Sequence, residues 1–89
     1  NLYELYLDDN KIEYLKRAHF VGIEALTSLY LSRNRISYIQ NGTLTMLIKL
    51  TSLDLSNNLL TELEPFYNSM QVMNLFNNKL TYLFPYDAY

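Results

Sequence analysis

The chain has 89 residues, enough for one small domain, and carries a formal net charge of −2 at pH 7 with no cysteine and one histidine. So small a charge, with acids and bases dispersed, argues against a nucleic-acid-binding stripe or attraction to an anionic membrane surface. Without cysteine there is no disulfide framework, and His19 has no neighbours at metal-ligand spacing. We therefore predict no metal, no cofactor and no catalytic site, and hence a protein that is not an enzyme.

One spacing of apolar residues and asparagine, L-x-x-L-x-L-x-x-N-x-L, occurs four times in chain order. The copies are Leu2, Leu5, Leu7, Asn10 and Ile12; Leu26, Leu29, Leu31, Asn34 and Ile36; Leu50, Leu53, Leu55, Asn58 and Leu60; and Met70, Met73, Leu75, Asn78 and Leu80. The asparagines are separated by 34−10 = 24, 58−34 = 24 and 78−58 = 20 residues. A period of this length indicates a solenoid of about four stacked units, over residues 2–25, 26–49, 50–69 and 70–89.

Each unit begins with a predicted β-strand, because the triplet L-x-L has a period of two. Leu5 and Leu7 should face the core while Tyr6, between them, faces out. The asparagine follows where the chain turns away from the strand, and its side-chain amide can bond backbone groups that the turn leaves unpaired. We expect a structural asparagine ladder, formed by Asn10, Asn34, Asn58 and Asn78.

The return segments also carry apolar residues at matching positions, and these should fill the other side of the core. They are Leu15, Phe20, Ile23, Ile39, Leu44, Leu47, Leu63 and Leu83. Pro65 and Pro85 favour extended or turn-like returns in the last two units. The fold class predicted is an α/β-type repeat solenoid with a short-stranded parallel sheet and mostly irregular or short helical return segments.

The stretch from residue 20 to residue 34 resembles the typical 24-residue subclass of leucine-rich repeats, and the resemblance extends over essentially the whole chain. That subclass is common in Toll-like receptor ectodomains and secreted insect immune proteins. The resemblance implies a right-handed coil with its sheet on a concave face, and a function in extracellular protein recognition, as part of a receptor or a secreted innate-immune protein. Met70 and Met73 depart from the leucine pattern, and the third unit is short. Because neither end carries a capping module, we interpret the chain as an internal fragment of a longer protein.

The outward positions of the sheet are the first candidates for a binding site, and the register gives four columns. They are Tyr6, Tyr30, Asp54 and Asn74; Glu4, Ser28, Ser52 and Val72; Asp8, Ser32, Ser56 and Phe76; and Asp9, Arg33, Asn57 and Asn77. Tyrosine and arginine are enriched in interface hot spots, so we predict partner contacts on this face. They centre on Glu4, Tyr6, Asp8, Tyr30, Arg33, Asp54, Asn74 and Phe76. The partner would be a protein ligand or another leucine-rich repeat chain, the latter giving a dimer.

Several alternatives stay open at this point. Tyr6 beside Tyr30 can serve only to stabilise the sheet by cross-strand stacking, and Asp9 with Arg33 can be no more than a surface ion pair. A further column, Tyr14, Tyr38, Glu62 and Tyr82, is expected on the flank of the coil, as packing rather than as a dimer contact. The chain as a whole can also be a spacer within a larger protein, or the recognition region of an intracellular adaptor.

The tripeptide Asn41-Gly42-Thr43 has the form of an N-glycosylation acceptor and lies in a return segment. A glycan at Asn41 would point away from the sheet and would agree with an extracellular location. Asn-Gly is equally a natural turn pair. The sequence alone leaves both interpretations standing.

Overall fold

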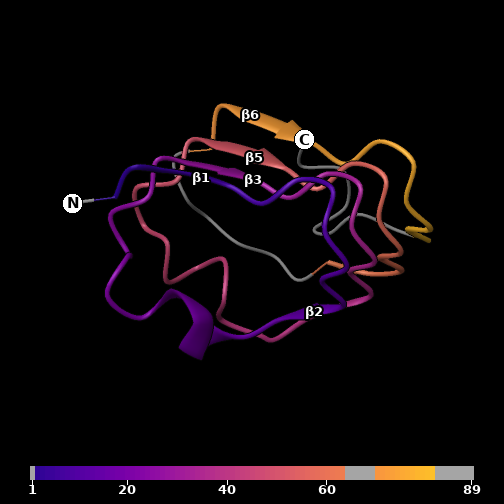
Figure 1. Cartoon of the computed structure of the whole chain (residues 1–89), viewed down its shortest axis with the longest axis horizontal. Helices are drawn as coiled ribbons and strands as arrows, with labels where there is room; N and C mark the ends of the chain where they lie inside the picture. The colour runs from indigo at the N-terminus through magenta and orange to yellow at the C-terminus, as the bar shows by residue number, and fades with distance from the viewer. Residues whose placement is uncertain (1, 64–69, 82–89) are drawn as a thin grey trace.

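The computed structural model describes residues 2–63 and 70–81. Within them, one short strand from each unit joins a parallel four-stranded sheet in the order β1-β3-β5-β6 (Figure 1). The strands are β1 (Glu4–Tyr6), β3 (Ser28–Tyr30), β5 (Ser52–Asp54) and β6 (Val72–Asn74). The register aligns equivalent positions of successive units, so Leu5 lies opposite Leu29, Leu29 opposite Leu53, and Leu53 opposite Met73. The predicted short-stranded parallel sheet is confirmed.

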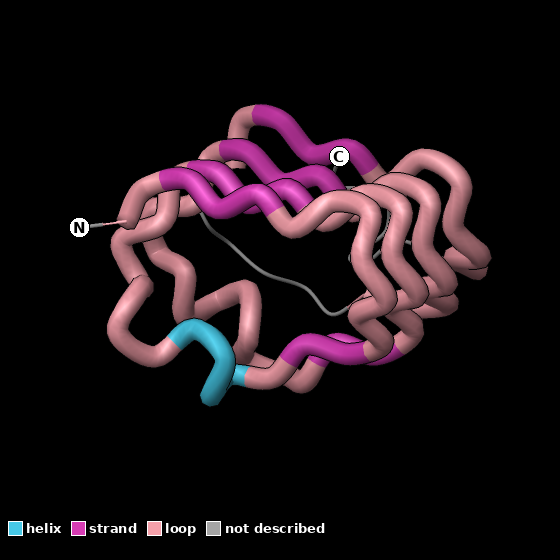
Figure 2. Tube along the Cα trace, in the orientation of Figure 1, coloured by secondary structure: helices cyan, strands magenta, loops and turns pink. Residues whose placement is uncertain are grey.

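A second, two-stranded parallel sheet lies on the opposite side of the core, made of β2 (Tyr14–Leu15) and β4 (Tyr38–Ile39) (Figure 2). It is followed in the first unit by a 3-10 helix, η1 (Arg17–Phe20). The return segments are thus mostly irregular with one short helix, as predicted, and the sequence analysis did not predict these two short strands. Tyr14 and Tyr38, which the sequence analysis placed on the flank of the coil, are paired with each other in this second sheet. The backbone N–H of Ser37 donates to Glu13 O at 2.9 Å and extends the pairing.

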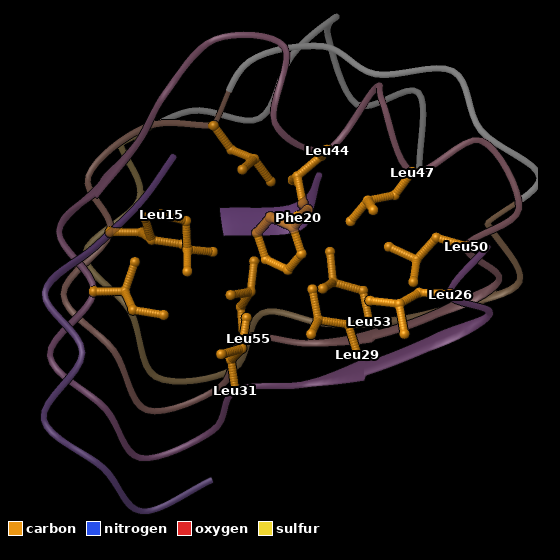
Figure 3. Close-up of a cluster of buried hydrophobic side chains, with 13 residues drawn as sticks. Leu15, Phe20, Leu26, Leu29, Leu31, Leu44, Leu47, Leu50, Leu53 and Leu55 are labelled. Carbon is orange, nitrogen blue, oxygen red and sulfur yellow. The ribbon is translucent and has the colours of Figure 1, made fainter. Parts of the chain in front are cut away.

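The hydrophobic core fills the space between the two sheets (Figure 3). Leu29 and Leu53 project into it from β3 and β5, and Phe20, Leu44 and Leu47 close it from the return segments. All five are buried, as the sequence predicted. The equivalent residues of the outer strands are only partly buried, as expected where a unit of a solenoid contacts only its neighbours.

The asparagine ladder joins neighbouring units through their backbones. Asn58 Nδ2 donates to Leu31 O of the preceding unit at 2.9 Å and to Leu55 O of its own unit at 3.0 Å, while its Oδ1 accepts from the N–H of Ile36 at 2.9 Å. Asn34 and Asn78 make the equivalent bonds one unit earlier and one unit later. Asn10 is exposed and bonds its own unit, at Leu7 O and Asp8 O. Three of the four predicted asparagines, Asn34, Asn58 and Asn78, therefore bond across units, whereas the bonds of Asn10 stay within its own unit.

The residue before each ladder asparagine has a left-handed backbone, which the sequence reasoning did not foresee. Asp9, Arg33, Asn57 and Asn77 have φ values of 60°, 56°, 58° and 59°. Asparagine and aspartate tolerate this conformation better than other non-glycine residues, so Arg33 is the unusual occupant. Pro65, Pro85, Leu83 and Tyr82, about which the sequence also made predictions, lie outside the described residues.

No helix in the part of the chain that the structure describes is long and apolar enough to cross a membrane.

Candidate protein-binding face

The open face of the four-stranded sheet is its outward side, together with the residues that follow each strand. Its central column is Tyr6, Tyr30, Asp54 and Asn74, and the register places each of these beside the next. The four strands lie side by side (Figure 2), so this column runs across the whole sheet, and the core lies on the other side of the sheet. The four central residues predicted from the sequence are therefore brought together.

Tyr6 and Tyr30 form a stacked aromatic pair on this face. Their ring centroids are 4.5 Å apart and the ring planes differ by 18°. Parallel neighbouring strands hold equivalent side chains about 4.8 Å apart, which is close to the separation that stacked rings prefer. Tyr6 remains 62% exposed, while Tyr30, which sits further inside the sheet, is half-buried. The pair thus offers a broad aromatic surface in a fixed position.

Glu4 holds the hydroxyl end of Tyr6. The phenol donates a hydrogen bond to Glu4 Oε1 at 3.1 Å, two residues away on the same face of β1. This bond to a carboxylate raises the pKa of Tyr6 above its ordinary value of 10.0, because it stabilises the protonated phenol. Tyr6 is therefore neutral and oriented, with its ring available.

Asp9 and Arg33 form an ion pair that bridges the first two units just beyond the strands. Arg33 Nε donates to Asp9 Oδ1 at 2.6 Å and Arg33 Nη2 donates to Asp9 Oδ2 at 3.0 Å, so the interaction is bidentate. The hydrogen bonds from Arg33 lower the pKa of Asp9 below its ordinary value of 3.8. Both side chains are more than half exposed, so the pair orders this surface more than it stabilises the fold. In the next two units Asn77 Nδ2 donates to Asn57 Oδ1 at 2.7 Å.

The remaining acids on the face are oriented by backbone N–H groups. Asp8 Oδ1 accepts from both the N–H and the hydroxyl of Ser32, each at 2.8 Å, and so links the first unit to the second. Asp54 Oδ1 accepts from the N–H of Ser56 at 2.9 Å. Asp8 and Asp54 thus each have one carboxylate oxygen, Oδ1, that accepts hydrogen bonds from within the protein. The sequence reasoning missed these bonds because they depend on how the chain bends after the strand.

The serines of the columns correct part of the sequence prediction. Ser28, Ser32 and Ser56 are buried, although the register alone placed them on the surface. Of the three, Ser32 has a hydroxyl that donates to the side chain of Asp8, at 2.8 Å. The exposed part of the candidate face is therefore narrower than the four columns suggested. It consists of the central column, the acidic and arginine side chains around it, and the apolar side chains of Val72 and Phe76.

Phe76 and Val72 make the apolar end of the open face, at β6. They are 73% and 59% exposed, although both are large apolar residues. Asn74, which lies between them in the sequence, accepts from the N–H of Phe76 at 3.0 Å and fixes the turn after the strand. The sequence prediction of an apolar surface at this end is confirmed for the described residues.

The opposite side of the molecule has a hollow of about 670 Å³ between η1 and the turn that follows β4. Its lining is Arg17, Ala18, Val21, Gln40, Gly42, Thr45 and Met46. This set offers no general base or nucleophile beside an acid. In the described residues there is also no group of three or more acidic or histidine side chains that could hold a metal ion. His19 is exposed, and its Nδ1 accepts a hydrogen bond from the N–H of Lys16 at 3.1 Å.

The family model for the leucine rich repeat matches residues 1–60 of the chain. This stretch contains the first two units and the third up to Leu60, including β1, β3 and β5. No curated protein matches the chain. Leucine-rich repeat domains are typically scaffolds without enzymatic activity that mediate binding between proteins.

Proposed function

Because the chain belongs to the leucine-rich repeat family, we propose that it recognises a protein partner through the open face of its four-stranded sheet. We further propose that it acts outside the cell, in a receptor ectodomain or a secreted innate-immune protein. The observation that carries the binding proposal is the Tyr6–Tyr30 stack, which is exposed and held in place on its own scaffold.

The stack has the properties of a binding hot spot. Two adjacent tyrosines provide a large area that remains amphipathic, and tyrosine has few rotamers to lose on binding. Their mutual stacking, and the hydrogen bond from Tyr6 to Glu4, already fix the rings before a partner arrives. Preorganised side chains lower the entropic cost of association, so more of the contact energy appears as affinity.

The charges around the stack favour a partner surface that is positively charged. Four carboxylates lie on this part of the face, and one guanidinium accompanies them: Glu4, Asp8, Asp9, Asp54 and Arg33. A lysine or arginine of the partner can lie over an exposed tyrosine ring while it faces these carboxylates. We therefore expect the association to weaken as salt is raised from about 50 mM to about 500 mM, because the Debye length shrinks. Affinity that is unchanged or stronger at high salt would contradict a basic partner surface.

Site-specific photo-crosslinking tests the proposal. A photoreactive phenylalanine analogue replaces Tyr6 on the open face or, as the matched control, Tyr14 on the second sheet. Tyr14 is also an exposed tyrosine in a parallel strand, 46% exposed. In extracellular fluid from the tissue that produces the protein, we expect the Tyr6 probe to capture one protein of defined mass and the Tyr14 probe not to do so.

Equal capture by both probes would mean that contact does not select the open face, and it would overturn the proposed site. Absence of any specific product from the Tyr6 probe would instead favour the spacer interpretation, in which these units only position other regions. Capture restricted to a cytosolic fraction would contradict the extracellular proposal while leaving the binding face intact.

A further inference from the structure

The turn after β4 contains a buried hydroxyl that the fold does not use. Thr43 is 0% exposed, and its Oγ1 has no hydrogen-bond partner in the part of the chain that the structure describes. Two residues earlier, Asn41 is exposed. Between them Gly42 has a φ of 88°, a backbone conformation that suits glycine. An exposed amide and an inaccessible hydroxyl thus belong to one tight turn.

Burying a hydroxyl without a partner is unfavourable, so its presence needs a reason. Other threonine hydroxyls do have partners: Thr27 Oγ1 bonds Tyr3 O at 3.2 Å, Thr45 Oγ1 bonds Gly42 O at 3.1 Å, and Thr51 Oγ1 bonds Thr27 O at 3.2 Å. Valine has nearly the shape of threonine and would bury no polar atom. Packing therefore explains a β-branched side chain at position 43 but not its hydroxyl.

A hydroxyl two residues after an asparagine is what N-glycosylation requires of its acceptor. We propose that Asn41 carries an N-linked glycan and that the glycan is attached before this turn folds, since the folded turn hides the Thr43 hydroxyl. The reaction forms a bond between Asn41 Nδ2 and the anomeric carbon of a sugar. It breaks the bond between that carbon and the pyrophosphate of a lipid-linked donor, and the amide loses one proton.

The surroundings of Asn41 can accommodate a sugar. Its two chain neighbours, Gln40 and Gly42, line the hollow of about 670 Å³ on the side away from the open face. A glycan there leaves the open face uncovered. The alternative is a turn that carries no glycan. Such a turn explains the glycine after Asn41, because a Cβ at residue 42 would meet Arg17 Cδ at 3.1 Å. It does not explain why residue 43 has a hydroxyl. This inference rests on the extracellular location proposed above, but not on the proposed binding face, which belongs to the other sheet.

Cell-free translation of the 89-residue chain behind a secretory leader, in the presence of microsomes, tests attachment. A mass shift that an N-glycosidase removes is expected for the unaltered chain and for Thr43→Ser. It should be absent from Thr43→Val and from Asn41→Gln. An unaltered chain that enters the microsomes without gaining a glycan would overturn the proposal.

The timing is tested with purified oligosaccharyltransferase and a lipid-linked donor. The folded, unglycosylated 89-residue chain should accept no sugar, whereas the same chain kept unfolded by a destabilising core substitution, Leu53→Asp, should accept it. Equal modification of both would refute attachment before folding.

The stability of unglycosylated variants tests the role of the Thr43 hydroxyl without any glycan being attached. For unglycosylated protein, Thr43→Val should have a urea midpoint equal to or above that of the unaltered chain. Thr27→Val is the matched control, because the Thr27 hydroxyl has a partner, and its midpoint should fall. If Thr43→Val fell as far as Thr27→Val, the Thr43 hydroxyl would be serving the fold, and the structural reason for the glycan would be gone.

Discussion

Asn58 shows what the repeated asparagine does for stability. Its amide bonds Leu31 O and Leu55 O, and its carbonyl oxygen accepts the N–H of Ile36, all in a buried setting. Asn58→Ala would leave these groups without partners, and each costs about 1–3 kcal/mol when unsatisfied. We expect a loss of at least about 2 kcal/mol in the free energy of unfolding, measured by urea denaturation.

Asn10 is the matched control for this substitution. It has the same place in its unit, but it is exposed and bonds only Leu7 O and Asp8 O. Asn10→Ala should therefore cost less than about 1 kcal/mol, as do most surface changes. Equal losses at the two positions would mean that the asparagine acts within each unit rather than between units.

The Asp9–Arg33 ion pair should be detectable in an acid titration of the Asp9 carboxyl. Since Arg33 lowers the folded-state pKa of Asp9 below 3.8, the contribution of the pair to stability is fully present above the ordinary pKa. It is lost as the pH falls through the lowered value. An NMR titration should place the pKa of the Asp9 carboxyl below 3.8, and Arg33→Gln should move it upward. An Asp9 pKa that Arg33→Gln leaves unchanged would show that the ion pair is not formed in solution.

Some residue-scale features follow from the sequence and others do not. The stack of Tyr6 on Tyr30 and the pairing of Asp9 with Arg33 could be predicted, because register in a parallel sheet places equivalent residues side by side. The bonds from Ser32 to Asp8 could not be, because they depend on the bend after the strand. The left-handed backbone at Arg33 was missed for the same reason, since arginine is not a residue that signals it.

At the scale of elements, the four strands of the main sheet could be predicted from the L-x-L triplets, because alternation gives a clear period of two. The strands β2 and β4 could not, because two residues are too few to show a period. Their pairing comes instead from stacking: once the first sheet fixes the distance between units, the return segments also come within hydrogen-bonding distance.

The strands should contribute unequally to the core. Leu53 of β5 is 1% exposed and packs between neighbouring units, whereas Leu5 of β1 is only partly buried. Leu53→Ala should therefore cost about 2–5 kcal/mol through lost burial and a residual cavity. Leu5→Ala should cost clearly less. Urea denaturation of the two variants measures the difference, and a larger loss at Leu5 would contradict the burial seen in the structure.

At the scale of the whole molecule, the repeat predicts the architecture, because every unit has the same spacing and each buries its leucines against the next. The position of the open face also follows, since the other side of the sheet must be covered by the core. The extent of the exposed surface on that face does not follow, because register alone does not predict that Ser28, Ser32 and Ser56 are buried. The core residues of this chain are thus easier to predict than the exposure of the residues on its open face.

The two sheets carry matched tyrosine pairs, and comparing them tests the central claim most directly. Tyr6 faces Tyr30 across β1 and β3, and Tyr14 faces Tyr38 across β2 and β4. The dissociation constant for the protein captured at Tyr6 would be measured by calorimetry for two variants, Tyr6→Ala/Tyr30→Ala and Tyr14→Ala/Tyr38→Ala, well below their melting temperatures. A hot-spot role predicts that the first variant binds at least about 10-fold more weakly and the second within about twofold of the unaltered protein. Equal loss in both variants, or loss confined to Tyr14→Ala/Tyr38→Ala, would contradict recognition through the open face.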